Sequence, residues 1–208
     1  MLHWKGKRPF RSTHFYPAQL KENHGEPTDG WMNQIYWGDN LQVMSHLLKK
    51  YRGQVKLIYI DPPFDSKADY KKKISLKGKT VESDHMAFEE KQYSDIWTND
   101  EYLQFMYERL ILMRELLSDD GSIYLHCDYR KVHQLRLILD EIFGIENFLN
   151  NVVWCYQTRQ FSKRYWNRKH DDILVFSKKI DGQIFNWDAK GVLETYSEST
   201  IKKYKLKD

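Results

Sequence analysis

Residues 55–64 read VKLIYIDPPF, and this stretch decides the fold. Its first six residues are almost continuously apolar, which is typical of a parallel strand buried on both faces. Proline cannot donate a hydrogen bond to a neighbouring strand, so the strand must end before Pro62. In open α/β sheets, ligands bind at the carboxyl ends of such strands. We therefore expect residues 61–64 to lie in a ligand site.

Alternating strand and helix patterns surround this stretch. Runs of β-branched and aromatic residues predict strands at residues 34–37, 55–60, 122–126, 151–156 and 172–176. Apolar residues at helical spacing predict helices at residues 41–48, 98–117 and 130–143, the second capped by Thr98 and stopped by Gly121. The pattern indicates an α/β fold with an incomplete, doubly wound, Rossmann-like sheet. We expect a mainly parallel sheet, with the last two strands as an antiparallel edge hairpin.

The pattern divides the chain into three regions. Residues 1–33 are interpreted as an irregular lead-in, because prolines and glycines recur there. Residues 34–180 hold the α/β pattern as one partial domain, and residues 181–208 are expected to begin a connecting region. Within the domain, residues 66–94 are charged and weakly periodic, which predicts a long loop or mobile flap.

The composition is that of a soluble globular domain. The chain has 208 residues, of which 41% are apolar and 30% charged. Its two cysteines, Cys127 and Cys155, have neither disulfide-type nor metal-ligand spacing, so we expect no metal site and a cytoplasmic location. The longest aliphatic run, at residues 110–113, is too short to cross a bilayer, so no membrane association is expected.

Basic residues gather in two places, although the net charge is only +4. A solvated surface is the ordinary explanation for such groups. A nucleic-acid groove is the alternative, because aromatic side chains interleave the second group. The candidate DNA-binding residues are Lys71, Lys72, Lys73, Arg159, Lys163, Arg164, Arg168 and Lys169.

The tetrad at residues 61–64 offers a specific chemistry. Asp61 supplies an acceptor-only carboxylate, Pro62 and Pro63 fix the backbone so that the Pro62 carbonyl points in a set direction, and Phe64 supplies a ring. An exocyclic amine needs two acceptors for its two N–H groups, so it could be held here with its ring stacked on Phe64. The competing interpretation is a strand that simply ends at a Pro-Pro turn.

Further motifs give the tetrad a family context. They lie at residues 38–41 (GDNL), 93–97 (YSDIW), 109–128 (ending in GSIYLHCD), 140–144 (DEIFG) and 169–178 (KHDDILVFSK). With the tetrad, they resemble the permuted branch of the DNA amino-methyltransferases, which methylate adenine N6 or cytosine N4 from S-adenosylmethionine. The nearest subgroup is the methylation subunit of Type III restriction-modification systems. The resemblance runs from about Ile35 to Lys178 and implies that residues 34–180 are a partial catalytic domain.

The resemblance implies roles for named residues. Asp61, Pro62, Pro63 and Phe64 would grip an adenine flipped out of double-stranded DNA; an Asp in first place favours adenine, with cytosine N4 as the alternative. Methyl transfer would be direct, so neither cysteine needs to be a nucleophile. Asp39, Asn40 and Asp61 would contact S-adenosylmethionine, although Asp39 is equally well explained as a helix N-cap. For His126 and Asp128 we expect structural or supporting roles.

One family motif is missing from the sequence. In this branch a glycine-rich cofactor loop follows the target-recognition region, whose start we expect at residues 181–208, yet Gly182 and Gly191 stand alone there. The resemblance also implies the sheet order 3-2-1-4-5-7-6, in which residues 34–37 are the third strand and residues 55–60 the fourth, so strands one and two are missing. Residues 55–60 thereby lose their neighbour on one side, which leaves an open sheet edge. We therefore expect weak activity from this chain alone, and as partners a complementary C-terminal half, a restriction subunit or a second copy.

Two other functions stay open from sequence. The chain could be a non-catalytic DNA-binding or assembly half of a split methyltransferase. It could also be an unrelated nucleotide-binding α/β protein, but a phosphate-cradling glycine loop is not present in the sequence. Binding of S-adenosylmethionine by the lone chain would favour the enzyme over the binding module.

Overall fold

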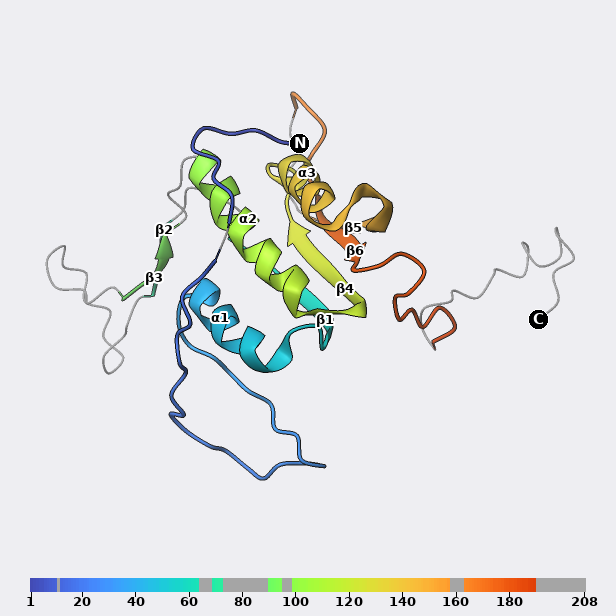
Figure 1. The fold of residues 1–208 in the computed structure, drawn as a ribbon. Helices are drawn as coiled ribbons and strands as arrows, with labels where there is room; N and C mark the ends of the chain where they lie inside the picture. Colours follow the sequence, from blue (N-terminus) through green and yellow to red (C-terminus); the bar gives the residue numbers. More distant parts are fainter. Residues whose placement is uncertain (11, 64–68, 73–89, 95–98, 158–162, 190–208) are drawn as a thin grey trace, which may run out of the picture.

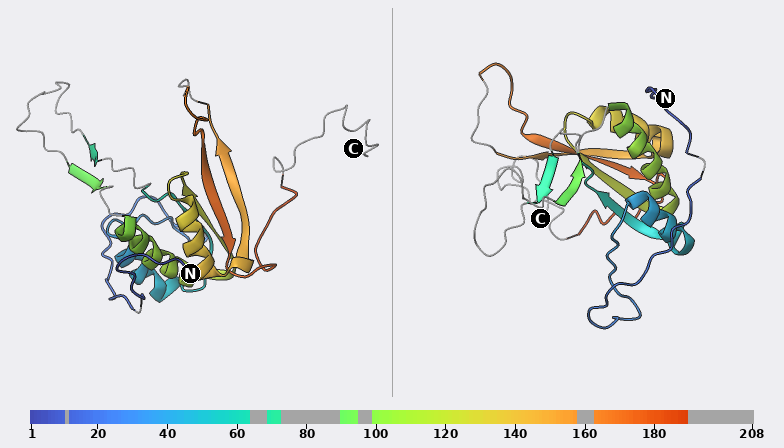
Figure 2. Two further views of the ribbon diagram at one scale, coloured as in Figure 1. Left: turned by 90° about the horizontal axis from the view of Figure 1, so that it is seen from above. Right: turned by 90° about the vertical axis from the view of Figure 1, so that its left-hand side faces the viewer.

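The structure, a computed structural model, describes residues 1–10, 12–63, 69–72, 90–94, 99–157 and 163–189. A four-stranded sheet carries three helices on one face (Figures 1 and 2). In chain order the elements are α1 Asn40–Tyr51, β1 Val55–Ile60, β2 Asp69–Lys72, β3 Glu90–Ser94, α2 Asn99–Leu116, β4 Leu117–Cys127, α3 Val132–Phe143, the 3-10 turn η1 Ile145–Asn147, β5 Phe148–Cys155 and β6 His170–Ser177.

The sheet has the strand order β1-β4-β6-β5. β1 and β4 are parallel, with Ile60 opposite Leu125, whereas β6 runs antiparallel to both β4 and β5. The predicted α/β fold with an antiparallel edge hairpin is therefore confirmed. Its parallel part, within the described residues, is the β1–β4 pair. The β5–β6 hairpin projects beyond the helices, as the left view of Figure 2 shows.

The strand predicted at residues 34–37 is wrong. These residues form neither strand nor helix, and Ile35 and Trp37 are each 99% exposed. A strand needs a neighbour for its backbone hydrogen bonds. In the sheet order implied by the family resemblance, that neighbour is one of the two missing strands, so β-forming residues alone do not produce a strand here.

β1 is buried on one face only, contrary to the prediction from its apolar run. Ile58 and Ile60 pack against the core beneath the helices, whereas Leu57 is 61% exposed and Tyr59 is 53% exposed. Within the described part of the chain, no layer covers this second face. β1 is also an edge strand, as predicted for the strand before the tetrad.

The boundary between α2 and β4 also differs from the prediction. The helix ends at Leu116 and the strand begins at Leu117, so Gly121 lies inside β4 and does not stop the helix. A Cβ atom at Gly121 would lie 2.8 Å from the Val55 carbonyl oxygen of β1. Glycine is needed here for close approach of two backbones. The predicted cap at Thr98 lies outside the described residues.

Residues 66–94 contain more order than the predicted loop. Within them β2 and β3 pair antiparallel, with Tyr70 opposite Tyr93. The two paired segments are far apart in the sequence and lack alternating hydrophobicity, so a local pattern cannot predict their pairing. Residues 66–68 and 73–89 of this prediction lie outside the described part.

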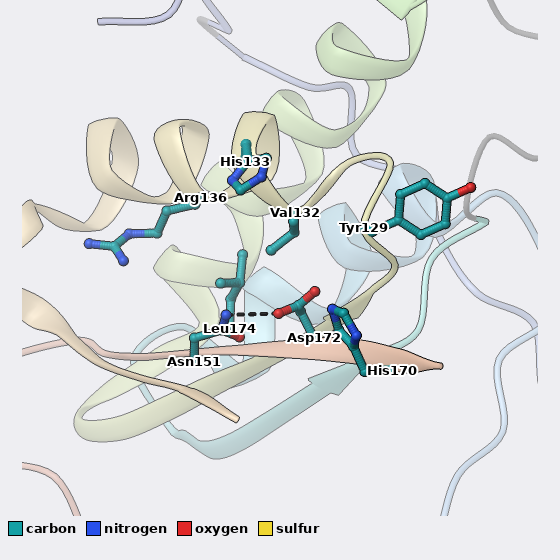
Figure 3. Close-up of a pocket in the computed structure, with 8 residues that line it drawn as sticks. All are labelled: Tyr129, Val132, His133, Arg136, Asn151, His170, Asp172 and Leu174. Carbon is teal, nitrogen blue, oxygen red and sulfur yellow. Dashed lines mark hydrogen bonds between the residues drawn. The ribbon is translucent and has the colours of Figure 1, made fainter. Parts of the chain in front are cut away.

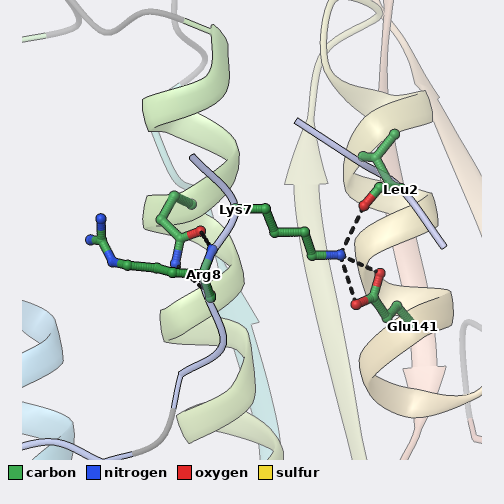
Figure 4. A network of polar contacts seen from close by, with 5 residues as sticks. Leu2, Lys7, Arg8 and Glu141 are labelled. Carbon is green, nitrogen blue, oxygen red and sulfur yellow. Dashed lines mark hydrogen bonds and ion pairs between the residues drawn. The ribbon is translucent and has the colours of Figure 1, made fainter. Parts of the chain in front are cut away.

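The N-terminal lead-in, residues 1–33, packs against the helices. Its described residues form no helix or strand apart from one isolated bridge. Trp4 is buried in the core. The Lys7 ammonium lies 2.8 Å from the Glu141 carboxylate of α3 and donates to the Leu2 carbonyl (Figure 4). The Arg8 amide donates to Gln104 of α2. Residues 1–10 therefore bridge α2 and α3.

Candidate functional site

Asp61 lies at the carboxyl end of β1, where the sequence placed it. Its side chain is 57% exposed, so the carboxylate is available to a ligand. Because Ile60 pairs with Leu125, the next residues of both strands come together. The Asp61 Oδ1 atom lies 3.6 Å from Nδ1 of His126, whose side chain is only 12% exposed.

His126 is surrounded by groups from the other strands. Its Nε2 lies 3.4 Å from the Asp171 Oδ2 of β6, and the Tyr59 hydroxyl lies 3.2 Å from Nδ1. The Trp154 ring of β5 stacks on the imidazole at 6.0 Å, with the ring planes 14° apart. We call these five residues the strand-end cluster: Tyr59, Asp61, His126, Trp154 and Asp171.

The prediction from sequence did not bring these five residues together. It assigned His126 a structural or supporting role, and His170 and Asp171 a role in turn geometry or in the wall of the base pocket. The available signal was the parallel register, which brings the carboxyl ends of two strands to one edge. The antiparallel register of β6, which brings Asp171 to the same edge, was not readable from a local pattern.

Tyr156 lies next to the cluster. Desolvation by burial raises the pKa of Tyr156, and the charge of Asp171 and a hydrogen bond to it raise the pKa further. The phenol therefore stays protonated near neutral pH and can donate to the carboxylate. This contact adds to the restraints on Asp171.

Asp39 and Asn40 lie at the start of α1 and are held by Arg109 of α2. Asp39 Oδ1 accepts the backbone N–H of Leu41 at 3.0 Å, which confirms the N-cap interpretation. Asp39 Oδ2 lies 2.9 Å from the buried Arg109 guanidinium, and Asn40 Oδ1 accepts from Arg109 Nε. Arg109 also lies over the Phe105 ring, 3.5 Å from its centroid. No role for Arg109 was predicted from the sequence.

The other tetrad residues are only partly described. Pro62 and Pro63 are half-buried, and Phe64 lies outside the described residues. The predicted stacking of a base on Phe64 is therefore not visible in this structure.

The predicted DNA-binding residues lie in different parts of the chain. Lys71 and Lys72 lie in β2, whereas Lys73 and Arg159 lie outside the described residues. Lys163, Arg164 and Arg168 are exposed.

Arg168 and Lys169, the last two predicted DNA-binding residues, contact neighbouring segments. Arg168 donates to the Tyr129 hydroxyl at 2.8 Å and lies over its ring. The Lys169 carbonyl accepts the backbone N–H of Tyr156 at 3.0 Å. The described basic residues at positions 163–169 thus lie on the segment that leads into β6.

A pocket of about 270 Å³ lies between α3 and the β5–β6 hairpin (Figure 3). In it, the Asn151 amide donates to the Asp172 carboxylate at 2.8 Å. Its lining is Tyr129, Val132, His133, Arg136, Asn151, His170, Asp172 and Leu174. Asp61 does not line this pocket, so it is separate from the strand-end cluster.

Cys127 and Asp128 have structural surroundings. Burial raises the pKa of the Cys127 thiol, and nearby carboxylates including Asp172 raise it further. Such a thiol is a poor nucleophile. Asp128 accepts the backbone N–H of Arg130 at 2.9 Å and pairs with its guanidinium, which closes the turn before α3. The N-cap of α3 is Lys131, not Asp128.

Within the described ranges, no group of three or more His, Cys, Asp or Glu side chains could hold a metal ion. The helices of the same ranges are too short or too polar to cross a bilayer.

The fold and site together define an α/β protein with an exposed carboxylate at the carboxyl end of a parallel edge strand. Residues 55–207 match the N6_N4_Mtase family, described as DNA methylase. The chain belongs to this family. The matched segment starts with β1 and includes the whole strand-end cluster.

Named relatives agree with this assignment. The Mod subunit of the Type III restriction-modification enzyme EcoP15I from Escherichia coli is 28% identical, over 98% of this chain and 35% of its own length. The Type II methyltransferase M.EcaI from Enterobacter cloacae is 32% identical, over 82% of this chain and 35% of its own. The chain thus spans about a third of the length of these relatives. A crystal structure of the M1.HpyAVI–SAM complex is 19% identical, with a TM-score of 0.47, over 79% of this chain and 62% of that one.

Proposed function

We propose that this chain carries the target-base site of a DNA methyltransferase that transfers a methyl group to adenine N6. The observation that carries the proposal is the exposed Asp61 carboxylate at the end of β1, within a chain of the DNA methylase family. A carboxylate at this place accepts an N–H of the target amine and stabilises the positive charge that develops on its nitrogen. The restriction-modification context follows from the named relatives.

The residues at the start of α1 fit S-adenosylmethionine as the cofactor. Each carboxylate oxygen has two acceptor positions, and Asp39 uses two on the helix cap, for the N–H groups of Leu41 and Gln42, and one on Arg109. Its side chain is 46% exposed, so acceptor capacity is left for a ribose hydroxyl. When bound, the cofactor supplies an electrophilic methyl group. Asp61 would orient the amine toward it, and no protein nucleophile is required.

The proposed DNA substrate is a duplex with the target base flipped out. Extrusion of a base costs a few kcal/mol, and backbone contacts beside the site offset part of that cost. The exposed Lys163, Arg164 and Arg168 lie on the segment that leads into β6, the strand that carries Asp171 of the cluster. We place the protein in the cytoplasm, where such a duplex is accessible.

A transfer experiment tests the proposal. Chain and duplex DNA are incubated with S-adenosylmethionine labelled in the methyl group, and the digested DNA is separated into nucleosides. Label in N6-methyladenine is the expected result. Label in N4-methylcytosine would show that the target base is cytosine and not adenine. DNA that stays unlabelled even after the C-terminal region of the EcoP15I relative is added would contradict the proposed function.

One observation favours a second function, a DNA-binding half that needs a partner. β1 is an edge strand, and Leu57 and Tyr59 are exposed on the uncovered face of the sheet. Unpaired backbone groups and apolar side chains at one place favour pairing with another segment. We propose that the complementary C-terminal region of a relative, a second copy or a restriction subunit supplies this layer.

Cofactor titration separates the two functions. Calorimetry is performed on the chain alone and then with the C-terminal region of the EcoP15I relative added. Saturable binding of S-adenosylmethionine by the lone chain supports the enzyme. DNA binding by the lone chain, with cofactor binding only after addition of the second segment, supports the partner-dependent half.

A further inference from the structure

We propose that His126 is a positioning residue for Asp61, held in place by Asp171 and by the Trp154 ring. This inference deepens the proposed function and rests on it for its catalytic meaning. Its physical content is a chain of contacts from β6 through β4 to the end of β1. The contacts join Asp171 to His126 and His126 to Asp61.

Asp61 needs such a restraint because of its position. It is the last residue before Pro62, which has no backbone N–H with which to hold a neighbouring carboxylate. Its side chain is more than half exposed, and an exposed carboxylate samples several rotamers. A group that must accept one N–H of a target amine works best in a single orientation. The Nδ1 edge of the His126 ring lies 3.6 Å from Asp61 Oδ1, where it can hold the carboxylate in one orientation.

His126 is itself fixed from three sides. Its side chain is largely buried, its Nε2 faces the Asp171 carboxylate, and its ring face stacks on Trp154. The Tyr59 hydroxyl reaches Nδ1 from the same strand that ends in Asp61. A buried imidazole with defined neighbours at both nitrogens has little freedom to rotate. The ring can therefore transmit a fixed position from β6 to Asp61.

The charges around the ring support an attractive contact. The titratable groups that face it are Asp61 and Tyr59 from β1 and Asp171 from β6, with Tyr156 behind Asp171. Each carboxylate faces one ring nitrogen, at 3.6 Å for Asp61 and 3.4 Å for Asp171, so each can accept an N–H from that nitrogen. A side chain that only filled space would offer neither contact.

Nuclear magnetic resonance of the histidine side chains tests the proposal on the whole 208-residue chain. The ring resonances of His126 are expected to shift in both Asp171→Asn and Asp61→Asn, and by less in Asp61→Asn, because the Asp61 carboxylate is the more exposed. The ring resonances of His133, which lines the separate pocket, are the internal control and should not move.

A second measurement reports on Asp61 directly. Three-bond Hα–Hβ couplings should show one Asp61 rotamer in the parent chain and averaged values in His126→Gln, while His133→Gln leaves them unchanged. If His126→Gln does not fold, the His126 ring resonances in Asp61→Asn decide. Ring resonances and couplings that stay unchanged in these variants overturn the proposal. Neither readout uses methylation, so an inactive chain would count against the proposed function and not against this inference.

Discussion

The guanidinium of Arg109 lies 2.9 Å from the carboxylate of Asp39, and this contact joins α2 to the start of α1. Burial lowers the pKa of Arg109, while the charge and hydrogen bond of Asp39 oppose that effect. The guanidinium stays charged, and its ion pair with Asp39 offsets part of the free energy that burial of this charge costs. One carboxylate thus caps a helix and neutralises a buried cation.

The two roles of Asp39 can be separated by substitution. Asn caps a helix as well as Asp but carries no charge, so Asp39→Asn should lose only the ion pair, about 1–3 kcal/mol for a pair buried on the Arg109 side and half-exposed on the Asp39 side. Asp39→Ala should lose the cap as well, about 1 kcal/mol more. Urea denaturation followed by circular dichroism measures both. Equal stability of the Asn and Ala variants would show that the cap contributes nothing.

Gly121 should not tolerate a side chain. A Cβ atom there would lie 2.8 Å from the Val55 carbonyl oxygen, so β1 and β4 would have to move apart. We expect Gly121→Ala to lower the free energy of unfolding by about 1–3 kcal/mol. Gly182→Ala, whose nearest neighbours lie at 3.6 Å, is the matched control and should be nearly neutral. Similar midpoints for both variants in urea would contradict the close approach.

The two cysteines should differ in reactivity. Cys127 is buried with a raised pKa, whereas Cys155 is exposed. Iodoacetamide at about pH 8 should modify only Cys155 in the native chain and both residues in denaturant, as mass spectrometry can show. Cys155→Ser should abolish the native reaction. Rapid modification of Cys127 in folded protein would be inconsistent with its burial.

The raised pKa of Cys127 also predicts a pH dependence of stability. In the unfolded chain the thiol ionises near its ordinary pKa of 9.0, but in the folded chain it stays protonated. The stabilisation is therefore fully present below that pH and is lost as the pH rises above it. Cys127→Ala should show a smaller loss of stability between about pH 8 and 10 than the parent chain.

Substitution of Asp61 should lower activity strongly and change stability little. In the preparation that methylates DNA, Asp61→Ala should lower kcat by about a hundredfold or more, since orientation and charge stabilisation are both lost. The thermal midpoint should stay within a degree or so because the side chain is mostly exposed. Transfer within a few-fold of the parent rate would show that Asp61 does not hold the amine.

The basic segment before β6 makes a prediction about salt. If Lys163 contacts a phosphate, Lys163→Ala should weaken DNA binding equally for all sequences and reduce the log–log salt slope by about one. Lys5→Ala, an exposed change in the lead-in, is the control for net charge. Fluorescence anisotropy at several salt concentrations gives the slopes. Equal slopes for both variants would place the duplex elsewhere.

The prediction from sequence succeeded where the signal was local. Helical spacing identified α1, α2 and α3 to within a few residues, because an amphipathic helix is specified by its own periodicity. Residues 55–60 were identified as a strand that ends at Asp61, because Pro62 cannot extend a ladder. Both signals depend on neighbours in the sequence and on no distant partner.

The predictions from sequence failed where contacts between segments far apart in the chain determine the structure. Residues 34–37 have β-forming side chains but no neighbouring strand, so Ile35 and Trp37 are exposed. β2 and β3 pair although neither shows a strand pattern. Gly121 ended a helix in the prediction, whereas in the structure it allows two strands to approach.

By itself, the sequence determined the α/β class of this protein, the end of β1 at Asp61 and the motifs of a DNA methylase. Only the tertiary structure decided that His126, Asp171 and Trp154 lie around that carboxylate, and that Arg109 holds Asp39. The physical reason is that a helix or strand end follows from the chemistry of adjacent residues. A contact between strands follows from the register of the whole sheet, which no single segment encodes.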